Sequence, residues 1–92
     1  MMTNVKRSVT ISKNLKWMRL IRGYTQRWIA ETLDIPSGTY GTYETGSTGI
    51  GKERLQKLCN FWNVDVEHLE MEPEDFRDWY RKERIYGSQA SR

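Results

Sequence analysis

The sequence predicts an all-α fold with five short helices and an additional amphipathic helix at the C-terminal end. Apolar residues recur at spacings of three and four along successive segments, which is the pattern of the buried face of a helix. Capping residues such as Ser, Thr and Asp precede these segments, and Gly or Asn follows them. Both prolines, Pro36 and Pro73, stand in the first turn of a predicted helix, where a backbone N–H would have no helical partner. The 92 residues suffice for one small domain.

The N-terminal segment is predicted to be an arm followed by a helix. Residues 1–11 lack helical periodicity and include Lys6 and Arg7, so we expect a basic, flexible arm. Ser12 is a suitable N-cap for a helix that ends before Gly23, because glycine readily adopts the left-handed conformation at which a helix stops. The inner face of this helix is expected to carry Leu15, Met18 and Ile21.

Two short helices joined by a tight turn are predicted next. Thr25 can cap a helix over 26–33, and a turn over 34–36 follows it. The next helix covers 37–45 and ends at Gly46. The apolar face of the first of these two helices consists of Ile29, Ala30 and Leu33.

The C-terminal half is predicted to hold three further helices. A strong 3.6-residue pattern lies over 52–62, and Asn63 breaks it. Asp65 caps a short helical turn that ends near Leu69, and the last helix covers about 73–85. The predicted organisation is an arm over 1–11, a helical domain over 12–70, a C-terminal helix for packing or dimerisation over 71–86, and a disordered tail over 87–92.

Charge is unevenly distributed along the chain. The net charge is +3, but residues 1–52 carry eight Lys and Arg against three Asp and Glu, whereas residues 53–92 carry seven against nine. A basic half of this kind is suited to a polyanionic partner such as nucleic acid.

Several classes of site are excluded by composition. Cys59 and His68 are the only cysteine and the only histidine, so neither an internal disulfide nor a zinc site of Cys and His ligands can form. His68 forms no recognisable acid–base pair with Glu67 and Glu70, and we expect no catalysis and no small-molecule substrate. Neither a signal peptide nor an apolar run approaching about 18 residues is present. We therefore expect a cytoplasmic protein without cofactor, metal or membrane partner.

Five segments of the chain share the spacing of one known family. They are Leu15-x-x-Met18-Arg19, Tyr24-Thr25-Gln26-x-x-Ile29-Ala30, Leu33-x-Ile35, Tyr40-x-x-Tyr43-Glu44-x-Gly46, and Leu55-x-x-Leu58-Cys59-x-x-Trp62-x-Val64. Together they resemble the DNA-binding domain of phage repressors and Cro, the xenobiotic-response-element (XRE) class of bacterial transcriptional regulators. The resemblance covers roughly residues 14–69. It implies a five-helix, lambda repressor-like fold with a helix-turn-helix whose third helix enters the major groove.

The resemblance also implies roles for individual residues. The positions that read bases in the family are occupied by Ser37, Gly38, Thr39 and Thr42. Contacts to the DNA backbone are implied for Thr25, Gln26, Arg27, Thr45, Ser47 and Lys52. The N-terminal arm and the residues just after it would bind phosphates or enter the minor groove through Lys6, Arg7 and Lys13. Arg19 and Glu44 match a partly buried structural ion pair.

Two departures from the family pattern bear on base reading. Asp34 replaces the glycine that is usual in the turn, although Asp tolerates a left-handed conformation better than most residues. The third helix contains Gly38 and Gly41, and its Ser, Thr and Tyr residues cannot form the bidentate contacts that Arg, Asn or Gln make with bases. Direct readout should therefore be modest, with DNA shape and phosphates contributing more. The alternative is that this helix has lost base reading and serves another surface.

Aromatic residues indicate a dimer or partner surface. Its candidates are Trp28, Phe76, Trp79 and Tyr80. Trp28 should be exposed because Ile29 and Ala30 take the buried positions, and it either meets a partner or packs over the arm or the C-terminal helix. The helix over 73–85 either folds back on its own domain or pairs with a second copy. We favour dimerisation, because two half-sites multiply affinity.

The predicted function is a DNA-binding transcriptional regulator, in particular a repressor, from a bacterium or carried on a phage or plasmid. Its expected partners are double-stranded DNA and a second copy of the chain. The alternative is a protein-interaction module, antitoxin-like or an adaptor, built on a helix-turn-helix scaffold with weakened base reading. That module would use Trp28 and the C-terminal aromatic residues.

Overall fold

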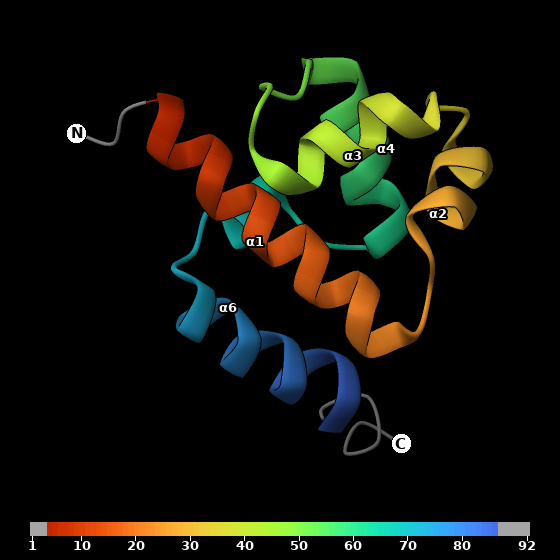
Figure 1. Cartoon of the computed structure of the whole chain (residues 1–92). Coiled ribbons are helices and arrows are strands. Elements are labelled where there is room, and N and C mark those ends of the chain that lie inside the picture. The colour runs from red at the N-terminus through yellow and green to blue at the C-terminus, as the bar shows by residue number, and fades with distance from the viewer. Residues whose placement is uncertain (1–3, 87–92) are drawn as a thin grey trace.

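Six α-helices and a short π-helix make up residues 4–86, the part of the chain that the computed structural model describes (Figure 1). The elements are α1 (Asn4–Arg22), α2 (Gln26–Leu33), α3 (Ser37–Thr45), α4 (Lys52–Trp62), α5 (Val66–Leu69), α6 (Pro73–Tyr80) and the π-helix η1 (Arg81–Tyr86). α1 runs through the middle of the molecule, with α2, α3 and α4 on one side and α6 on the other. The all-α prediction is confirmed. The start of the predicted arm and the predicted tail over 87–92 lie outside the described residues.

Helix ends follow the predicted caps. α2, α3 and α4 begin and end at the predicted residues, and α5 also lies where expected. The hydroxyl oxygen of Thr25 accepts the backbone N–H of Trp28 at 3.0 Å, as an N-cap does. Asp34, Gly46 and Asn63 each end a helix in the left-handed conformation, with φ of 56°, 77° and 56°. Asp34 therefore adopts the left-handed conformation for which glycine is usual in this turn.

The start of α1 differs from the prediction. The helix begins at Asn4, so the expected flexible arm is wrong for the described residues before Ser12, and Ser12 is not an N-cap. Ser12 is buried, and its hydroxyl lies 2.6 and 2.5 Å from the carbonyl oxygens of Ser8 and Tyr43, which share its one hydrogen. Ile11 is buried beside it. The early turns of α1 thus pack against the end of α3, and this tertiary packing supports a helix that the local pattern does not predict.

One hydrophobic core joins all six α-helices. Each helix contributes at least one side chain with no exposed surface: Leu15, Met18, Ile29, Ala30, Tyr40, Leu58, Leu69 and Phe76. Ile21, expected on the inner face of α1, is instead 38% exposed. The physical reason is geometric. Two steps of three residues turn a helix about 120° away from the starting direction, so Ile21 no longer faces the same way as Leu15.

Asn14 is a fully buried polar residue that fastens α1 to the C-terminal helices. Its side-chain amide donates to the backbone oxygens of Leu69 and Met71, both at 2.9 Å. These two carbonyls belong to the end of α5 and the link to α6. The hydrogen bonds therefore fix where the chain turns towards α6.

α6 folds back on its own domain (Figure 1). Phe76 and Tyr80 are 0% and 3% exposed, and both rings meet the ring of Trp17 edge to face, at 6.1 and 5.5 Å between centroids. Trp79 stacks on His68 at 3.8 Å. Of the two arrangements considered for this helix, packing within the chain is the one observed. Because α1 covers these two rings, Phe76 is not available to a dimer or partner surface, and Tyr80 offers only its 3% exposed edge.

Candidate nucleic-acid interface

The α2–turn–α3 unit presents one face of α3 outward. The turn is fastened by the Ile35 N–H, which donates to the Ala30 carbonyl at 2.8 Å. On α3, the side facing the core is buried and consists of Tyr40, Tyr43 and Glu44. The opposite side exposes Ser37, Gly38 and Thr45, with Thr39 and Thr42 half-buried at its edge. All four residues expected to read bases thus lie on one helix, and none belongs to the core.

A buried ion pair holds α3 against α1. The Arg19 guanidinium donates through Nε and Nη2 to the two carboxylate oxygens of Glu44, at 2.8 and 2.9 Å. The phenol of Tyr40 donates to the same carboxylate at 2.6 Å, and the amide of Gln26 donates to it at 3.0 Å. The Arg19 and Glu44 side chains are only 10% and 1% exposed. Helices α1, α2 and α3 therefore meet at one carboxylate.

The hydrogen bonds of this cluster fix its charge state. Burial alone would raise the pKa of the Glu44 carboxyl, but the hydrogen bonds from Arg19, Tyr40 and Gln26 outweigh burial and leave that pKa below its usual value. Burial, followed by the hydrogen bond to Glu44, raises the pKa of the Tyr40 phenol. The hydrogen bond to Glu44 raises the pKa of Arg19 despite burial. The cluster accordingly holds a carboxylate, a neutral phenol and a guanidinium cation at neutral pH.

Gln26 links the first turn of α2 to α3. Its amide donates to Glu44, and a Cβ built on Gly41 would lie 3.6 Å from the Gln26 side-chain oxygen. The amide nitrogen carries two hydrogens, and Glu44 uses one of them. Gln26 is half-buried, so the second hydrogen can serve an anion at the start of α2. The structure thus places Gln26 at the α2 N-terminus, where the resemblance implies a phosphate contact.

Hydroxyl groups border the outward face of α3. Thr42 donates to the Thr39 carbonyl at 2.7 Å, and its hydroxyl lies 2.7 Å from that of Thr48. The hydroxyls of Thr45 and Ser47 are 2.9 Å apart. Each of these hydroxyls can donate a hydrogen bond to a phosphate oxygen. They bring the end of α3 and the following loop together as one polar edge.

The start of α4 adds positive potential beside this edge. Gly51 occupies the N-cap position, and no side chain of the described residues caps the helix there. The first amides of α4 are therefore free for an anion, which the helix dipole also favours. Lys52 is exposed at the first helical position. The residues expected to contact the DNA backbone after α3, namely Thr45, Ser47 and Lys52, thus lie along one segment that ends at a helix N-terminus.

The other basic residues are less uniformly placed. Arg7 forms an ion pair with Glu70, so its guanidinium is held by the acidic C-terminal half. Arg27 is exposed and pairs with Glu31 at 3.1 Å. Lys13 is exposed on α1. The side chain of Lys6 lies outside what the structure describes.

The hydrogen bond from the Tyr40 phenol to Glu44 was not predicted from the sequence. The signal was the spacing of Tyr40 and Glu44, since residues four apart meet on a helix. The hydrogen bond that the Tyr43 hydroxyl accepts from Arg54, at 3.1 Å, was not predicted either. No comparable local pattern links Tyr43 to α4, so only the fold shows that contact.

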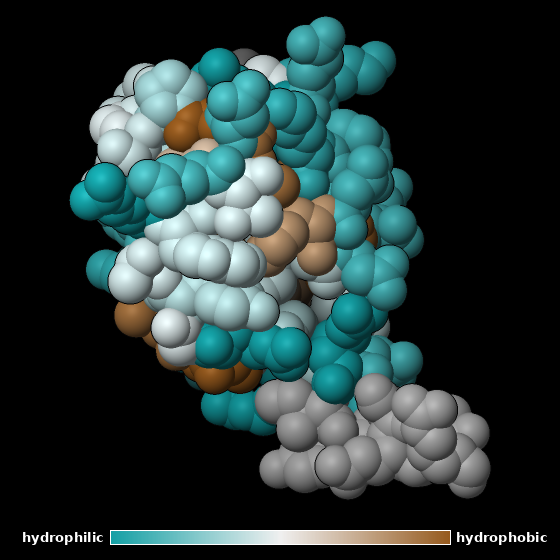
Figure 2. Space-filling model, turned by 90° about the vertical axis from the view of Figure 1, so that its right-hand side faces the viewer, coloured by the Kyte–Doolittle hydropathy of each residue, from teal (hydrophilic) through white to brown (hydrophobic). Residues whose placement is uncertain are grey.

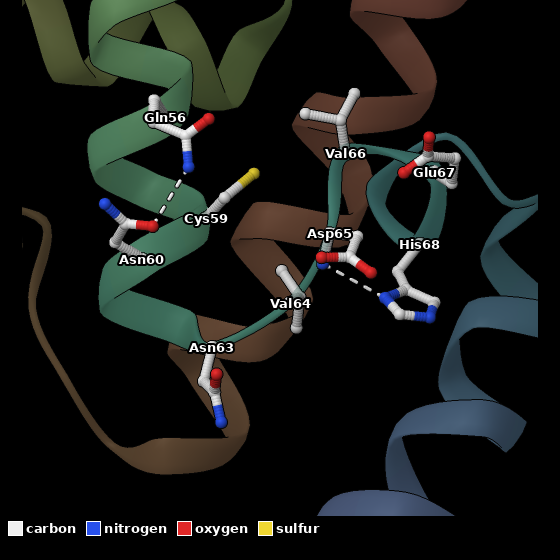
Figure 3. Close-up of a pocket in the computed structure, with 9 residues that line it drawn as sticks. All are labelled: Gln56, Cys59, Asn60, Asn63, Val64, Asp65, Val66, Glu67 and His68. Carbon is white, nitrogen blue, oxygen red and sulfur yellow. Dashed lines mark hydrogen bonds between the residues drawn. The ribbon is translucent and has the colours of Figure 1, made fainter.

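A polar hollow of about 770 Å³ lies between α4 and α5 (Figure 3). Its lining includes Cys59, Asp65 and His68. Burial, together with the charges of Asp65 and Glu67, raises the pKa of the Cys59 thiol. The His68 Nδ1 accepts the Asp65 backbone N–H at 3.0 Å, so that ring nitrogen serves the cap of α5. Among residues 4–86, no three His, Cys, Asp or Glu side chains are grouped so that they could hold a metal ion.

Comparisons with known proteins agree with this geometry. A family model described as helix-turn-helix matches residues 15–69. The chain is similar to the HTH-type transcriptional regulator ImmR of Bacillus subtilis (strain 168), with 34% identity over 61 residues. The aligned region covers 66% of this chain and 48% of that relative, so the chain spans about half the length of the curated relative it matches. No solved structure matches the chain significantly.

Proposed function

The chain belongs to the helix-turn-helix family, and from that premise we propose that it is a transcriptional regulator that binds double-stranded DNA by placing α3 in the major groove. The observation that carries the proposal is the division of α3 into two sides. Tyr40 and Glu44 fix the helix from behind, while Ser37 and Gly38 project no large side chain outward. A helix held rigidly with a slim outer side can lie deep in a groove.

Base reading is assigned to the outward side of α3. Ser37, Thr39 and Thr42 supply hydroxyls that can bond either groove edge, and threonine methyls can touch thymine. Gly38 leaves open space where a Cβ would stand, so the backbone itself can come close to the bases. Shape and phosphate contacts would then provide a larger share of the specificity than direct base contacts.

Contacts to the DNA backbone are assigned to both sides of α3. On the α2 side they are Thr25, Gln26 and Arg27, and beyond α3 they are Thr45, Ser47 and Lys52. Two helix N-termini support this assignment: that of α2, where Gln26 donates to Glu44 in the last turn of α3, and that of α4, which follows the loop after α3. Lys6, Arg7 and Lys13 remain candidates for phosphate contacts, and Arg7 would have to exchange Glu70 for a phosphate.

We further propose that two copies bind one DNA site. A single nine-residue helix spans only a few base pairs, and paired half-sites lie about 34–36 Å apart. The longest dimension of the molecule is 38 Å, so two copies can sit side by side at that spacing. Repression follows as the simplest output, because a bound protein excludes others from the same DNA. Such a protein would act in the cytoplasm, where bacterial or phage DNA lies.

The proposal is tested with DNA selected from a random duplex pool, followed by a salt titration on the enriched sequence. We expect a palindromic motif and an affinity that falls steeply with salt, since each phosphate contact adds about −0.9 to the slope of log K against log salt. An absence of enrichment together with a slope near zero contradicts DNA binding. Enrichment of a single, non-repeated half-site contradicts the proposal that two copies bind one site, but it leaves the proposal of DNA binding intact.

A further inference from the structure

A cluster of aromatic rings is exposed where α2 meets the end of α4. Trp28 stacks on Tyr24 with ring centroids 4.5 Å apart, and Phe61 lies 6.0 Å from Trp28 and 6.2 Å from Tyr24. Trp28 remains 44% exposed, and within the described part of the chain its ring meets those of Tyr24 and Phe61. Figure 2, which views the side where α2 lies, shows pale and brown residues in the middle of the face, with teal residues around them.

A small cavity adjoins this aromatic cluster. Its volume is about 260 Å³, and its lining consists of Arg22, Tyr24, Phe61, Trp62, Tyr80 and Arg84. Tyr24 and Phe61 belong both to the cavity and to the cluster, so the two form one continuous surface. Pockets for whole small molecules typically measure about 300–1,000 Å³. A cavity below that range suits a single side chain better than a whole small molecule.

The cavity offers hydrogen-bond donors and positive charge without an acid of its own. Arg22 and Arg84 line it, and neither forms an ion pair within residues 4–86. One guanidinium nitrogen of Arg84 donates to the Asn63 carbonyl at 3.0 Å, which orients the side chain. Trp62 is 6% exposed, and its indole N–H is buried without an acceptor in the described chain. A ligand group with a negative charge that accepts hydrogen bonds would complement these donors.

We infer that this surface docks an acidic segment of a protein partner. A carboxylate of that segment enters between Arg22 and Arg84, beside the Trp62 ring, while a neighbouring apolar side chain packs on Trp28. Two features favour a peptide over a nucleic-acid phosphate. The surface beside the cavity is apolar, and exposed Trp beside Arg is the composition of protein interface hot spots. The inference concerns a different surface from the proposed DNA interface and stands independently of it.

The test uses ¹⁵N-labelled protein and two probes, N-acetyl-Phe-Glu-amide and its uncharged counterpart N-acetyl-Phe-Gln-amide. We expect the Glu probe to move the Trp62 indole N–H resonance in a saturable titration, and the Gln probe to bind at least about tenfold more weakly. Arg84→Gln should lower the affinity for the Glu probe by a similar factor. Arg81→Gln is the matched control, because Arg81 lies over the Trp17 ring outside the cavity.

Trp28→Ala should weaken both probes, since both carry the apolar side chain. Equal binding of the two probes overturns the inference, and so does an equal loss in Arg84→Gln and Arg81→Gln. If the Trp62 resonance instead moves when protein alone is concentrated, a second copy occupies the surface and the peptide assignment is wrong. A short DNA duplex that shifts the same resonance in place of the peptide also overturns it.

Discussion

The carboxylate of Glu44 receives both Nε and Nη2 of Arg19, at 2.8 and 2.9 Å, in a bidentate pair that joins α1 to the last turn of α3. The pair is almost fully covered, and Tyr40 and Gln26 occupy the remaining acceptor sites of the carboxylate. A buried charge with this many donors is satisfied as long as all of them stay in place. Removing one partner leaves the other charge without compensation.

Arg19→Met should therefore destabilise the protein by about 3–5 kcal/mol, the usual range for breaking a buried pair. Arg27→Met is the matched control, because the Arg27 and Glu31 side chains are 83% and 66% exposed and such pairs contribute less than about 1 kcal/mol. The measurement is urea denaturation of both variants beside the wild type. Equal losses in the two variants would mean that the Arg19–Glu44 pair is not buried in solution.

Acid should destabilise the fold through Glu44. The pKa of this carboxyl is lower in the folded protein than its ordinary value, so the folded state holds the proton less readily than the unfolded chain. The resulting stabilisation is complete above the unfolded pKa, about 4.3 for Glu, and is lost as pH falls through the lower, folded pKa. Urea denaturation between pH 6 and pH 3 measures the effect. In Glu44→Gln this part of the pH dependence should vanish, and an unchanged pH profile would assign it to other carboxylates.

Gly38→Ala should separate stability from DNA binding. A Cβ at Gly38 meets nothing within 4 Å, so alanine should stabilise the free protein by about 0.5–1 kcal/mol. The same methyl group would stand between α3 and DNA, and affinity for the selected duplex should fall. Gly46→Ala is the opposite control, since Gly46 has φ of +77° and its Cβ would lie 3.2 Å from the Ser12 hydroxyl. A rise in melting temperature without loss of affinity would show that α3 does not approach DNA closely at Gly38.

Asn14→Leu should loosen the link between α1 and the C-terminal helices. Among the described residues, the change removes the only side-chain donor to the backbone oxygens of Leu69 and Met71, and each buried, unsatisfied group costs about 1–3 kcal/mol. The Asn14 side-chain oxygen has no partner in the described chain, and its removal offsets part of the loss. Asn60→Leu, at an exposed position, should change the free energy of unfolding by no more than about 0.5 kcal/mol. Similar losses in both variants would argue against a special role for Asn14.

Lys52→Ala should reduce the salt dependence of DNA binding by one phosphate contact. Lys52 stands at the start of α4, where free amides already favour an anion. The slope of log K against log salt should become shallower by about 0.9. Lys82→Ala removes an exposed charge from η1, at the other end of the molecule from the α3–α4 loop (Figure 1), and should leave the slope unchanged. A slope that changes equally in both variants would reflect overall charge rather than a contact.

Local sequence signals predicted the helix ends because each end is decided by a few neighbouring residues. Thr25 caps α2, and Asp34 and Asn63 adopt the left-handed conformation that ends a helix. The start of α1 could not be predicted in this way. Its first turns depend on contacts with Tyr43 and the end of α3, more than thirty residues away along the chain.

In the candidate site, too, features decided by neighbouring residues were predictable and features decided by distant contacts were not. The placement of Ser37 and Gly38 on the outer side of α3 follows from helical periodicity, and it was predictable. The ion pair between Arg19 and Glu44 was accessible only through the family resemblance. The cavity beside Trp62 gave no signal in the sequence, because Arg22 and Arg84 are brought together by the return of α6 along α1.

The two-sided character of α3 has a consequence for how such a protein changes over generations. The residues that hold the helix, Tyr40, Tyr43 and Glu44, are interleaved with outward residues that touch little of the core. Ser37, Gly38 and Thr45 can therefore be exchanged with little effect on folding, and under the proposed mode of DNA binding such exchanges would change the target sequence while the scaffold is retained. If α3 lies in the major groove as proposed, longer side chains grafted onto this outer row would direct the protein to a chosen DNA site.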